Sequence, residues 1–283
     1  MKLVVVLCLI FLIEACSTSS MGRNQITLFS ESELAKMGSS SFEQMKKQET
    51  INKDKATNDF VQCVVQAITK NVDKRVHKGE WEVVVFDSAQ INAFALPSGK
   101  IGVYLGILNI TENQDQLAAI IGHEVGHVIE RHSNERLSSG KLAQAGLVVA
   151  GAAMTAKGVE NKNLWMAGLG LGLQYGILMP YGRAHESEAD IIGQNLMARS
   201  GFDPAASMRL WENMGKVSKK QPAEFLSTHP SHSTRIKQLS SNLSTAMTFY
   251  QTENPPHCPK PSVIPKPIPK IVKSVDKSVI PEK

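Results

Sequence analysis

The pentapeptide His-Glu-Val-Gly-His at residues 123–127 restricts the possible folds of this chain more than any other segment. Two histidines four positions apart lie on the same face of an α-helix, so both imidazoles can reach one metal ion. Apolar residues recur at helical spacing from Leu117 to Ile129, which predicts a helix from Asn113 to about Leu137. An exposed His/Glu cluster would need no such apolar face, and we therefore interpret the segment as a metal-binding helix.

A zinc site with catalytic activity needs a third protein ligand and a base. Glu124 lies beside the first histidine, where it can take a proton from water. Residues 186–190, Glu-Ser-Glu-Ala-Asp, supply the further carboxylates on a second predicted helix. Glu186 and Asp190 share one helix face, whereas Glu188 points to the other side. We therefore expect Glu186 to be the third ligand and Asp190 to orient a ligand histidine. His185 and Glu188 are expected on the solvated surface.

The net charge of +5 comes almost entirely from the C-terminal segment. Residues 254–283 hold six lysines against Asp276 and Glu282, which leaves +4 there and a nearly neutral remainder. The same segment has eight prolines, a composition that cannot bury a core, and we expect a disordered Pro/Lys-rich tail over residues 251–283. Nothing in the sequence indicates a nucleic-acid partner.

The N-terminus has the pattern of an export signal. Lys2 precedes an apolar run from Leu3 to Ile13 that is too short to cross a bilayer. Residues 13–16, Ile-Glu-Ala-Cys, resemble a lipobox, although Glu at its second position is unusual. We expect a lipoprotein signal peptide at residues 1–15, lipidation of Cys16, and a polar tether at residues 16–30. An ordinary secretory signal with an unrelated cysteine is the alternative.

Two further cysteines, Cys63 and Cys258, belong to the mature chain. An oxidising compartment favours a disulfide between them. The sequence does not show that they lie within bonding distance, so two unpaired thiols remain the alternative.

The remaining pattern predicts an α+β fold that is mostly helical. Helices are expected at residues 32–48, 57–72, 183–199 and 233–247. Short β-rich segments at residues 81–86, 91–96 and 100–104 predict a small antiparallel sheet beside the metal helix. Residues 142–156 and 164–179 are rich in Ala, Gly and Leu, and we expect a buried helix and a glycine-rich loop there; membrane insertion is the alternative.

Four motifs together resemble one family of zinc metallopeptidases. They are HEVGH (residues 123–127), RAHESEAD (183–190), HPSHSTRI (229–236) and NAFALPSGKIGVYLG (92–106). Their order and spacing are similar to the family of the CAAX prenyl protease, HtpX, BepA and LoiP, over residues 30–247. The lipobox makes the chain most similar to LoiP-like periplasmic lipoproteins. The resemblance implies a zincin metallopeptidase domain of the gluzincin type at residues 31–250.

The resemblance also implies roles for individual residues. It assigns His123, His127 and Glu186 to one zinc ion per chain, Glu124 to the base, and Asp190 to the orientation of a ligand.

Five further residues have roles that the resemblance implies. His229 would be a fourth ligand at rest or a transition-state stabiliser, although on its chemistry alone it could be a surface residue before a proline. Arg235 would brace the site. Asn92, Ala93 and Phe94 would form the edge strand that binds substrate, or an ordinary structural strand.

We therefore expect a zinc metalloendopeptidase of the bacterial envelope that hydrolyses unfolded or misassembled outer-membrane proteins. It would be lipid-anchored at the periplasmic face of the outer membrane, with an envelope chaperone or protease as a possible partner. A lipid-anchored assembly factor with structural zinc is one alternative, but a structural site needs no base such as Glu124. A peptidoglycan hydrolase is another, although a peptide-binding strand favours protein substrates.

Overall fold

The computed structural model describes residues 16–173, 179–218, 229 and 232–267. The helices are α2 (Glu31–Gln48), α3 (Lys55–Thr69), α4 (Leu105–Leu108), α5 (Gln114–Ile129), α6 (His132–Ala156), α7 (Lys162–Leu173), α8 (Met179–Arg199), α9 (Ala206–Ser218) and α11 (His232–Thr248). The strands are β1 (Cys16–Thr18), β2 (Asn24–Ile26), β3 (Glu82–Phe86), β4 (Ala93–Leu96) and β5 (Lys100–Tyr104). The predicted mostly helical α+β fold is confirmed. The predicted signal peptide, residues 1–15, lies outside the described part.

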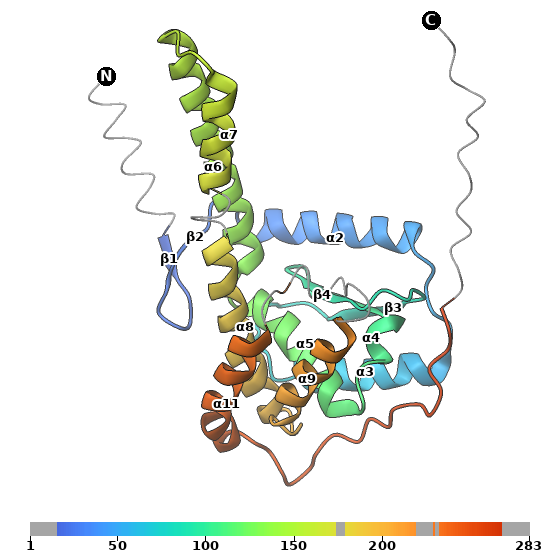
Figure 1. Ribbon diagram of the computed structural model, residues 1–283. Coiled ribbons are helices and arrows are strands. Elements are labelled where there is room, and N and C mark those ends of the chain that lie inside the picture. Colours follow the sequence, from blue (N-terminus) through green and yellow to red (C-terminus); the bar gives the residue numbers. More distant parts are fainter. Residues whose placement is uncertain (1–15, 174–178, 219–228, 230–231, 268–283) are drawn as a thin grey trace, which may run out of the picture.

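A three-stranded sheet lies between α2 on one face and α3 and α5 on the other (Figure 1). Its strand order is β3-β5-β4, with β4 antiparallel and β3 parallel to β5. The prediction of an antiparallel sheet was therefore wrong for β3. After β3 the chain crosses to the opposite side of β5, where it forms β4. A tight turn at Gly99, whose φ of 70° suits glycine, then leads from β4 into β5. This order leaves β4 as an outer strand, next to α5.

Helix α5 packs on α8 more closely than ordinary side chains would permit. A Cβ atom at Gly193 would lie 2.6 Å from the backbone nitrogen of His123. A Cβ atom at Gly126 would lie 2.9 Å from the carbonyl oxygen of Ala189. Both distances are too short for a side chain, so glycine is required at both positions. The result is that the two helices predicted to carry the ligands are held backbone to backbone.

The metal helix ends earlier than the periodicity predicted. Helix α5 begins after Asn113, whose side chain accepts a hydrogen bond from the backbone of Gln116, and it ends at Ile129. Arg131 then adopts a left-handed conformation with φ of 55°, and α6 begins at His132. Residues 130–136 contain no proline or glycine to mark this break, which is why the sequence indicated one helix to about Leu137.

Helices α6 and α7 form a hairpin that projects from the body (Figure 1). Val148, Leu164 and Trp165 on this hairpin are 66%, 74% and 61% exposed. The prediction of a buried helix at residues 142–156 was therefore wrong, as was the prediction of a loop over the described part of residues 164–179. Small residues such as alanine are good helix formers, and in the projecting part of the hairpin α6 and α7 pack against one another.

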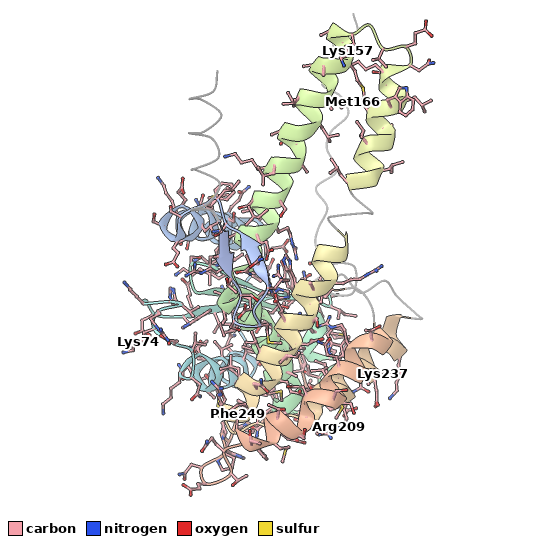
Figure 2. All side chains as sticks on the ribbon, turned by 90° about the vertical axis from the view of Figure 1, so that its left-hand side faces the viewer. Lys74, Lys157, Met166, Arg209, Lys237 and Phe249 are labelled. Carbon is pink, nitrogen blue, oxygen red and sulfur yellow. A yellow bond between two sulfur atoms is a disulfide. The ribbon has the colours of Figure 1, made fainter. Side chains whose placement is uncertain are left out.

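Lys157 and Met166 mark the projecting end of the hairpin in Figure 2. Residues 174–178, between α7 and α8, lie outside the described part. Among the described helices, none combines the length and the apolar character that a membrane crossing requires.

The expected tether at residues 16–30 is instead an ordered part of the fold. Strands β1 and β2 pair antiparallel, and Ser19 and Gln25 are buried. Ser30 then caps α2 through a capping box with Glu33. The segment is polar because its side chains bond to buried charged groups of other elements, so its composition resembled that of a solvated linker.

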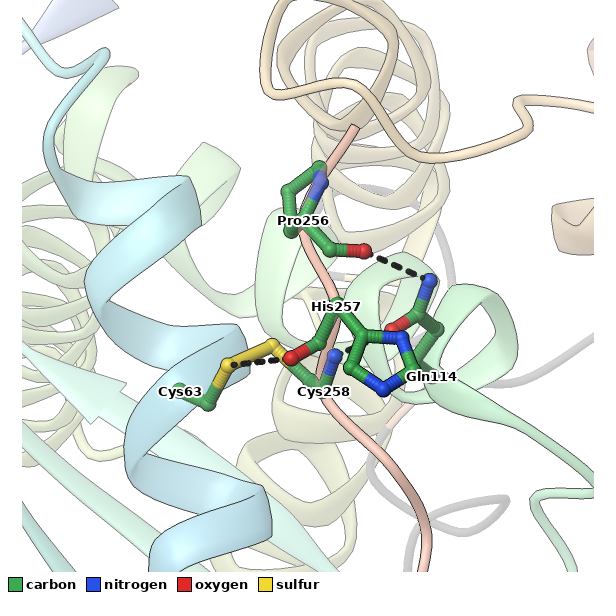
Figure 3. The surroundings of a disulfide bond; sticks show 5 residues. All are labelled: Cys63, Gln114, Pro256, His257 and Cys258. Carbon is green, nitrogen blue, oxygen red and sulfur yellow. Dashed lines mark hydrogen bonds between the residues drawn. A yellow bond between two sulfur atoms is a disulfide. The ribbon is translucent and has the colours of Figure 1, made fainter. Parts of the chain in front are cut away.

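The C-terminal segment is also ordered over residues 251–267, contrary to the expected disorder. Cys258 is buried and forms a disulfide with Cys63 of α3 (Figure 3). Gln114 holds the same segment by accepting a hydrogen bond from the Cys258 backbone and donating one to the carbonyl oxygen of Pro256. Residues 268–283 lie outside the described part.

The disulfide closes a loop of 195 residues, so its removal should lower the stability of the chain. A cross-link over so long a loop restricts the unfolded chain, and we expect a loss of roughly 2–5 kcal/mol in the free energy of unfolding. Urea unfolding of the wild type with and without reductant measures it. The Cys63→Ser variant should match the reduced wild type and be insensitive to reductant. An unchanged urea midpoint after reduction would contradict the expectation.

Candidate metal centre

Four side chains from two helices and one adjoining segment lie close together. His123 and His127 come from α5, Glu186 from α8, and His229 precedes α11. One ligand atom from each lies within 4.8 Å of the others, and all four residues are buried. The structure thus brings together the three ligands expected from the sequence and places His229 with them.

The atoms that face one another fix which nitrogen of each histidine points inward. His127 Nε2 lies 3.1 Å from His123 Nε2 and 3.5 Å from Glu186 Oε1. His229 Nδ1 lies 2.8 Å from Glu186 Oε2 and 3.2 Å from His123 Nε2. Three imidazole nitrogens and a carboxylate therefore surround one point.

Asp190 and Arg235 hold His123 from behind. The outward Nδ1 of His123 lies 3.1 Å from Asp190 Oδ1, as expected for a carboxylate that orients a ligand. Arg235 donates to both oxygens of Asp190, at 2.6 Å from Nε and 2.5 Å from Nη2. The Arg235 guanidinium also stacks 3.6 Å from the ring of Trp211. Sequence reasoning did not find Trp211, because its helix carries no motif around it.

Glu124 is buried and lies at the edge of this cluster. Its Oε1 makes no hydrogen bond with any described residue, and His229 Nε2 is 3.5 Å away. Burial raises the pKa of Glu124 above its usual value. A buried carboxylate next to a ligand cluster, with one oxygen that makes no hydrogen bond, suits a general base that acts on water.

The electrostatics of the cluster favour a cation at its centre. Burial would raise the pKa of Glu186, but hydrogen bonds from His123 and His229 lower it far below the usual range. Burial would lower the pKa of His123, and the Arg235 charge acts in the same direction, but hydrogen bonds with Asp190 and Glu186 raise it to about 9. Burial also lowers the pKa of His127. The Glu186 carboxylate therefore stays charged, and either protons or a metal dication must balance it.

The donor set fits zinc. Neutral imidazole nitrogens with one carboxylate are ligands that Zn²⁺ prefers, and three protein ligands with one further position make a catalytic site. His123, His127 and Glu186 would hold the ion, with His229 at the remaining corner. Oε1 of Glu124, which makes no hydrogen bond with a described residue, is consistent with a water molecule beside that ion.

A second buried cluster lies beside the first, where the sequence predicted surface residues. His185 and Glu188 are both buried, which contradicts their expected exposure. His185 lies 2.9 Å from Glu135, and Glu188 lies 2.9 Å from His132. Residues 132–135 and 185–188 repeat the pattern His-x-x-Glu, and this repeat is the signal that could have revealed the cluster.

Strands β1 and β2 form an N-terminal hairpin, and Arg23 lies between them. Arg23 bridges the two carboxylates of this second cluster. Burial would raise the pKa of Glu135 and of Glu188, but hydrogen bonds from the neighbouring histidines and from Arg23 lower both to about 2. Both groups are therefore ionised over the neutral range.

A cavity of about 460 Å³ connects the metal-binding cluster to the outer strand of the sheet. Its wall includes Glu124, His127 and His229, and β4 with the residue before it contributes Asn92, Ala93 and Phe94. Leu34 and Met37 of α2 also line the cavity. The segment expected to bind substrate thus lies in one cleft with the expected base, although its role stays a prediction.

Comparison with known proteins decides the family. The model of peptidase family M48 matches residues 55–243, which include both ligand-bearing helices and β4. The chain belongs to peptidase family M48. The family is one of zinc metalloendopeptidases, and the buried His/His/Glu/His cluster lies within the matched segment.

The M48 relatives come from mitochondria and bacteria. "Mitochondrial metalloendopeptidase OMA1" of Schizosaccharomyces pombe is 35% identical over 179 residues, which cover 62% of this chain and 50% of that protein. OMA1 of Saccharomyces cerevisiae is 34% identical over 210 residues, 70% of this chain and 57% of that protein. "Beta-barrel assembly-enhancing protease" of Escherichia coli is 28% identical over 166 residues, 56% of this chain and 34% of that protein. The chain thus spans about half the length of the first two relatives and a third of the last.

The position of His229 predicts the effect of removing it. Because its nitrogen lies among the ligand atoms, it would occupy the corner where water must bind, and we expect His229→Ala to raise basal proteolysis with zinc retained. Initial rates with bound zinc measured in parallel test this. A rate loss of roughly 10²–10³ would instead make His229 an oxyanion donor. An unchanged rate would exclude both roles.

Proposed function

We propose that this M48 enzyme degrades unfolded or misassembled outer-membrane proteins, as a LoiP-like lipoprotein of the bacterial envelope. The observation that carries the proposal is the shared cleft of β4 and Glu124. Strand β4 is an outer strand that pairs with β5 among the described residues. An extended peptide can add to such an edge through backbone hydrogen bonds, which read little sequence and require an unfolded substrate.

The residues of the cleft would have separate roles in the reaction. Residues 92–94 would align the substrate backbone beside the metal-binding cluster. Glu124 would take a proton from the attacking water at Oε1 and later deliver it to the leaving amine. Its raised pKa makes it a stronger base than an exposed glutamate. Zinc, when bound, polarises the scissile carbonyl and lowers the pKa of its water.

The substrate class is supported by the similarity to the Escherichia coli protein named beta-barrel assembly-enhancing protease. The OMA1 proteins share more identity with this chain, and they are named as mitochondrial. The lipobox before Cys16 favours the envelope over a mitochondrial setting. A chaperone or protease of the same envelope would be its partner.

A proteolysis assay tests the proposed function. The wild type should cleave casein and an unfolded outer-membrane β-barrel protein, and a zinc chelator should abolish both activities. Glu124→Gln should retain zinc but lose roughly 10²–10⁴ in rate, because an amide cannot accept the proton. Metal analysis of each variant accompanies the assay.

Glu212→Gln is the matched control for that assay. This residue is exposed on α9, and its loss should leave cleavage unchanged. Near-normal activity of Glu124→Gln would exclude Glu124 as the base. Binding of unfolded barrels without cleavage would indicate an assembly factor, and release of muropeptides would indicate a peptidoglycan hydrolase.

We also propose a lipid anchor at Cys16, at the start of β1. The Cys16→Ala variant should move from the membrane fraction to the soluble periplasmic fraction, because it lacks the thiol that carries the lipid. Cell fractionation with immunoblotting measures this, and Thr18→Ala, exposed two residues on, is the control. Membrane attachment that persists in Cys16→Ala would contradict the anchor and point to the exposed apolar residues of α6 and α7.

A further inference from the structure

The metal ligand His127 is connected to the N-terminal hairpin through two side chains. Its outward nitrogen, Nδ1, lies 2.8 Å from Nδ1 of His132 at the start of α6. The other nitrogen of His132, Nε2, lies 2.9 Å from Glu188 Oε2 on α8. Arg23 donates to that same oxygen at 2.7 Å. His132 and Glu188 are buried, so these contacts have little competition from water.

One arrangement of protons satisfies every contact in this series. His127 presents Nε2 to the cluster, so its proton must lie on Nδ1, where it is donated to His132 Nδ1. His132 then carries its own proton on Nε2 and donates it to Glu188. Glu188 is a carboxylate and accepts. The orientation of Glu188 thus determines the tautomer of His132, and through it the tautomer of the metal ligand.

The N-terminal hairpin fixes the orientation of Glu188. Ser19 donates to Glu188 Oε1 at 2.8 Å, and Arg23 contacts both oxygens of the carboxylate. Arg23 also donates to Glu135 at 2.5 Å and 2.8 Å, which holds the guanidinium itself in place. A planar guanidinium can bridge two carboxylates in this way, whereas a lysine ammonium is a single point charge.

We propose that Arg23, Glu188 and His132 are positioning residues for the metal ligand His127, so that the N-terminal β-hairpin is required for tight zinc binding. The hairpin lies outside the segment matched by the M48 model, residues 55–243. The family model does not cover the hairpin, so its contribution to the site is inferred from the contacts within this chain. Since β1 begins at Cys16, the attachment point of the proposed anchor is only seven residues from the group that fixes the network.

Zinc affinity of the full-length chain tests the proposal, by competition with a chromogenic chelator. The His132→Phe variant removes the acceptor for His127 at similar volume, and we expect the zinc dissociation constant to rise by roughly 10–100-fold. His132→Asn keeps an acceptor oxygen near the former Nδ1 and should recover part of the affinity. Arg23→Gln should weaken zinc binding in the same direction.

A double variant separates positioning from ordinary stabilisation. If Arg23 acts through His132, then adding Arg23→Gln to His132→Phe should weaken zinc binding little further. Melting temperatures of the zinc-free variants are measured beside the affinities, because a purely structural role would lower the melting temperature alone. Arg209→Gln, which breaks an exposed ion pair with Asp203, is the matched control and should leave the zinc affinity unchanged.

Two results would overturn the proposal. One is a folded Arg23→Gln or His132→Phe variant whose zinc affinity stays within about twofold of wild type, well below the change expected for a group that orients a ligand. The other is full additivity in the double variant. If Arg23→Gln does not fold, Arg23→Lys, which keeps the charge but cannot bridge both carboxylates, replaces it in the same comparison, and an unchanged affinity there would equally refute the role of Arg23.

Discussion

The close contact between α5 and α8 is the constraint on which the metal centre depends. Glycine at residues 126 and 193 brings the two helix backbones together, and any larger residue there would collide with a backbone atom of the opposite helix. Because side chains of adjacent helices then project into the same narrow space, Glu186 reaches the two histidines of α5. The site is thus a consequence of backbone packing, and the ligands themselves add charge that the rest of the structure must balance.

That balance is achieved in two layers of charged side chains. Asp190 and Arg235 form the layer behind His123, and the Glu188–Arg23 pair forms the layer behind His127. The outward nitrogens of His123 and His127 therefore each contact a partner side chain, and their inward nitrogens face the metal-binding cluster. Buried ions are costly unless paired, so these elements must assemble together for the site to form. This explains why a polar N-terminal segment is folded against the core.

The sequence predicted the site better than its surroundings. Spacing alone placed His123 and His127 on one helix face and separated Glu186 and Asp190 from Glu188, because helical periodicity is a local property. It did not predict that Glu188 and His185 are buried, since their partners Arg23 and Glu135 lie far away in the chain. The parallel pairing of β3 with β5 was not predicted either, because it also joins segments that are not adjacent in the chain. The exposure of the α6–α7 hairpin was not predicted, because apolar composition normally indicates burial.

The central claim is that one zinc ion is held by His123, His127 and Glu186, with His229 at the fourth corner. X-ray absorption at the zinc edge of the purified full-length protein tests it most directly. The account predicts one zinc per chain with only nitrogen and oxygen neighbours, at about 2.0–2.2 Å. The His229→Ala variant should lose one imidazole from the same spectrum. A sulfur neighbour at about 2.3 Å, or zinc that stays bound when both His123 and His127 are replaced by alanine, would contradict it.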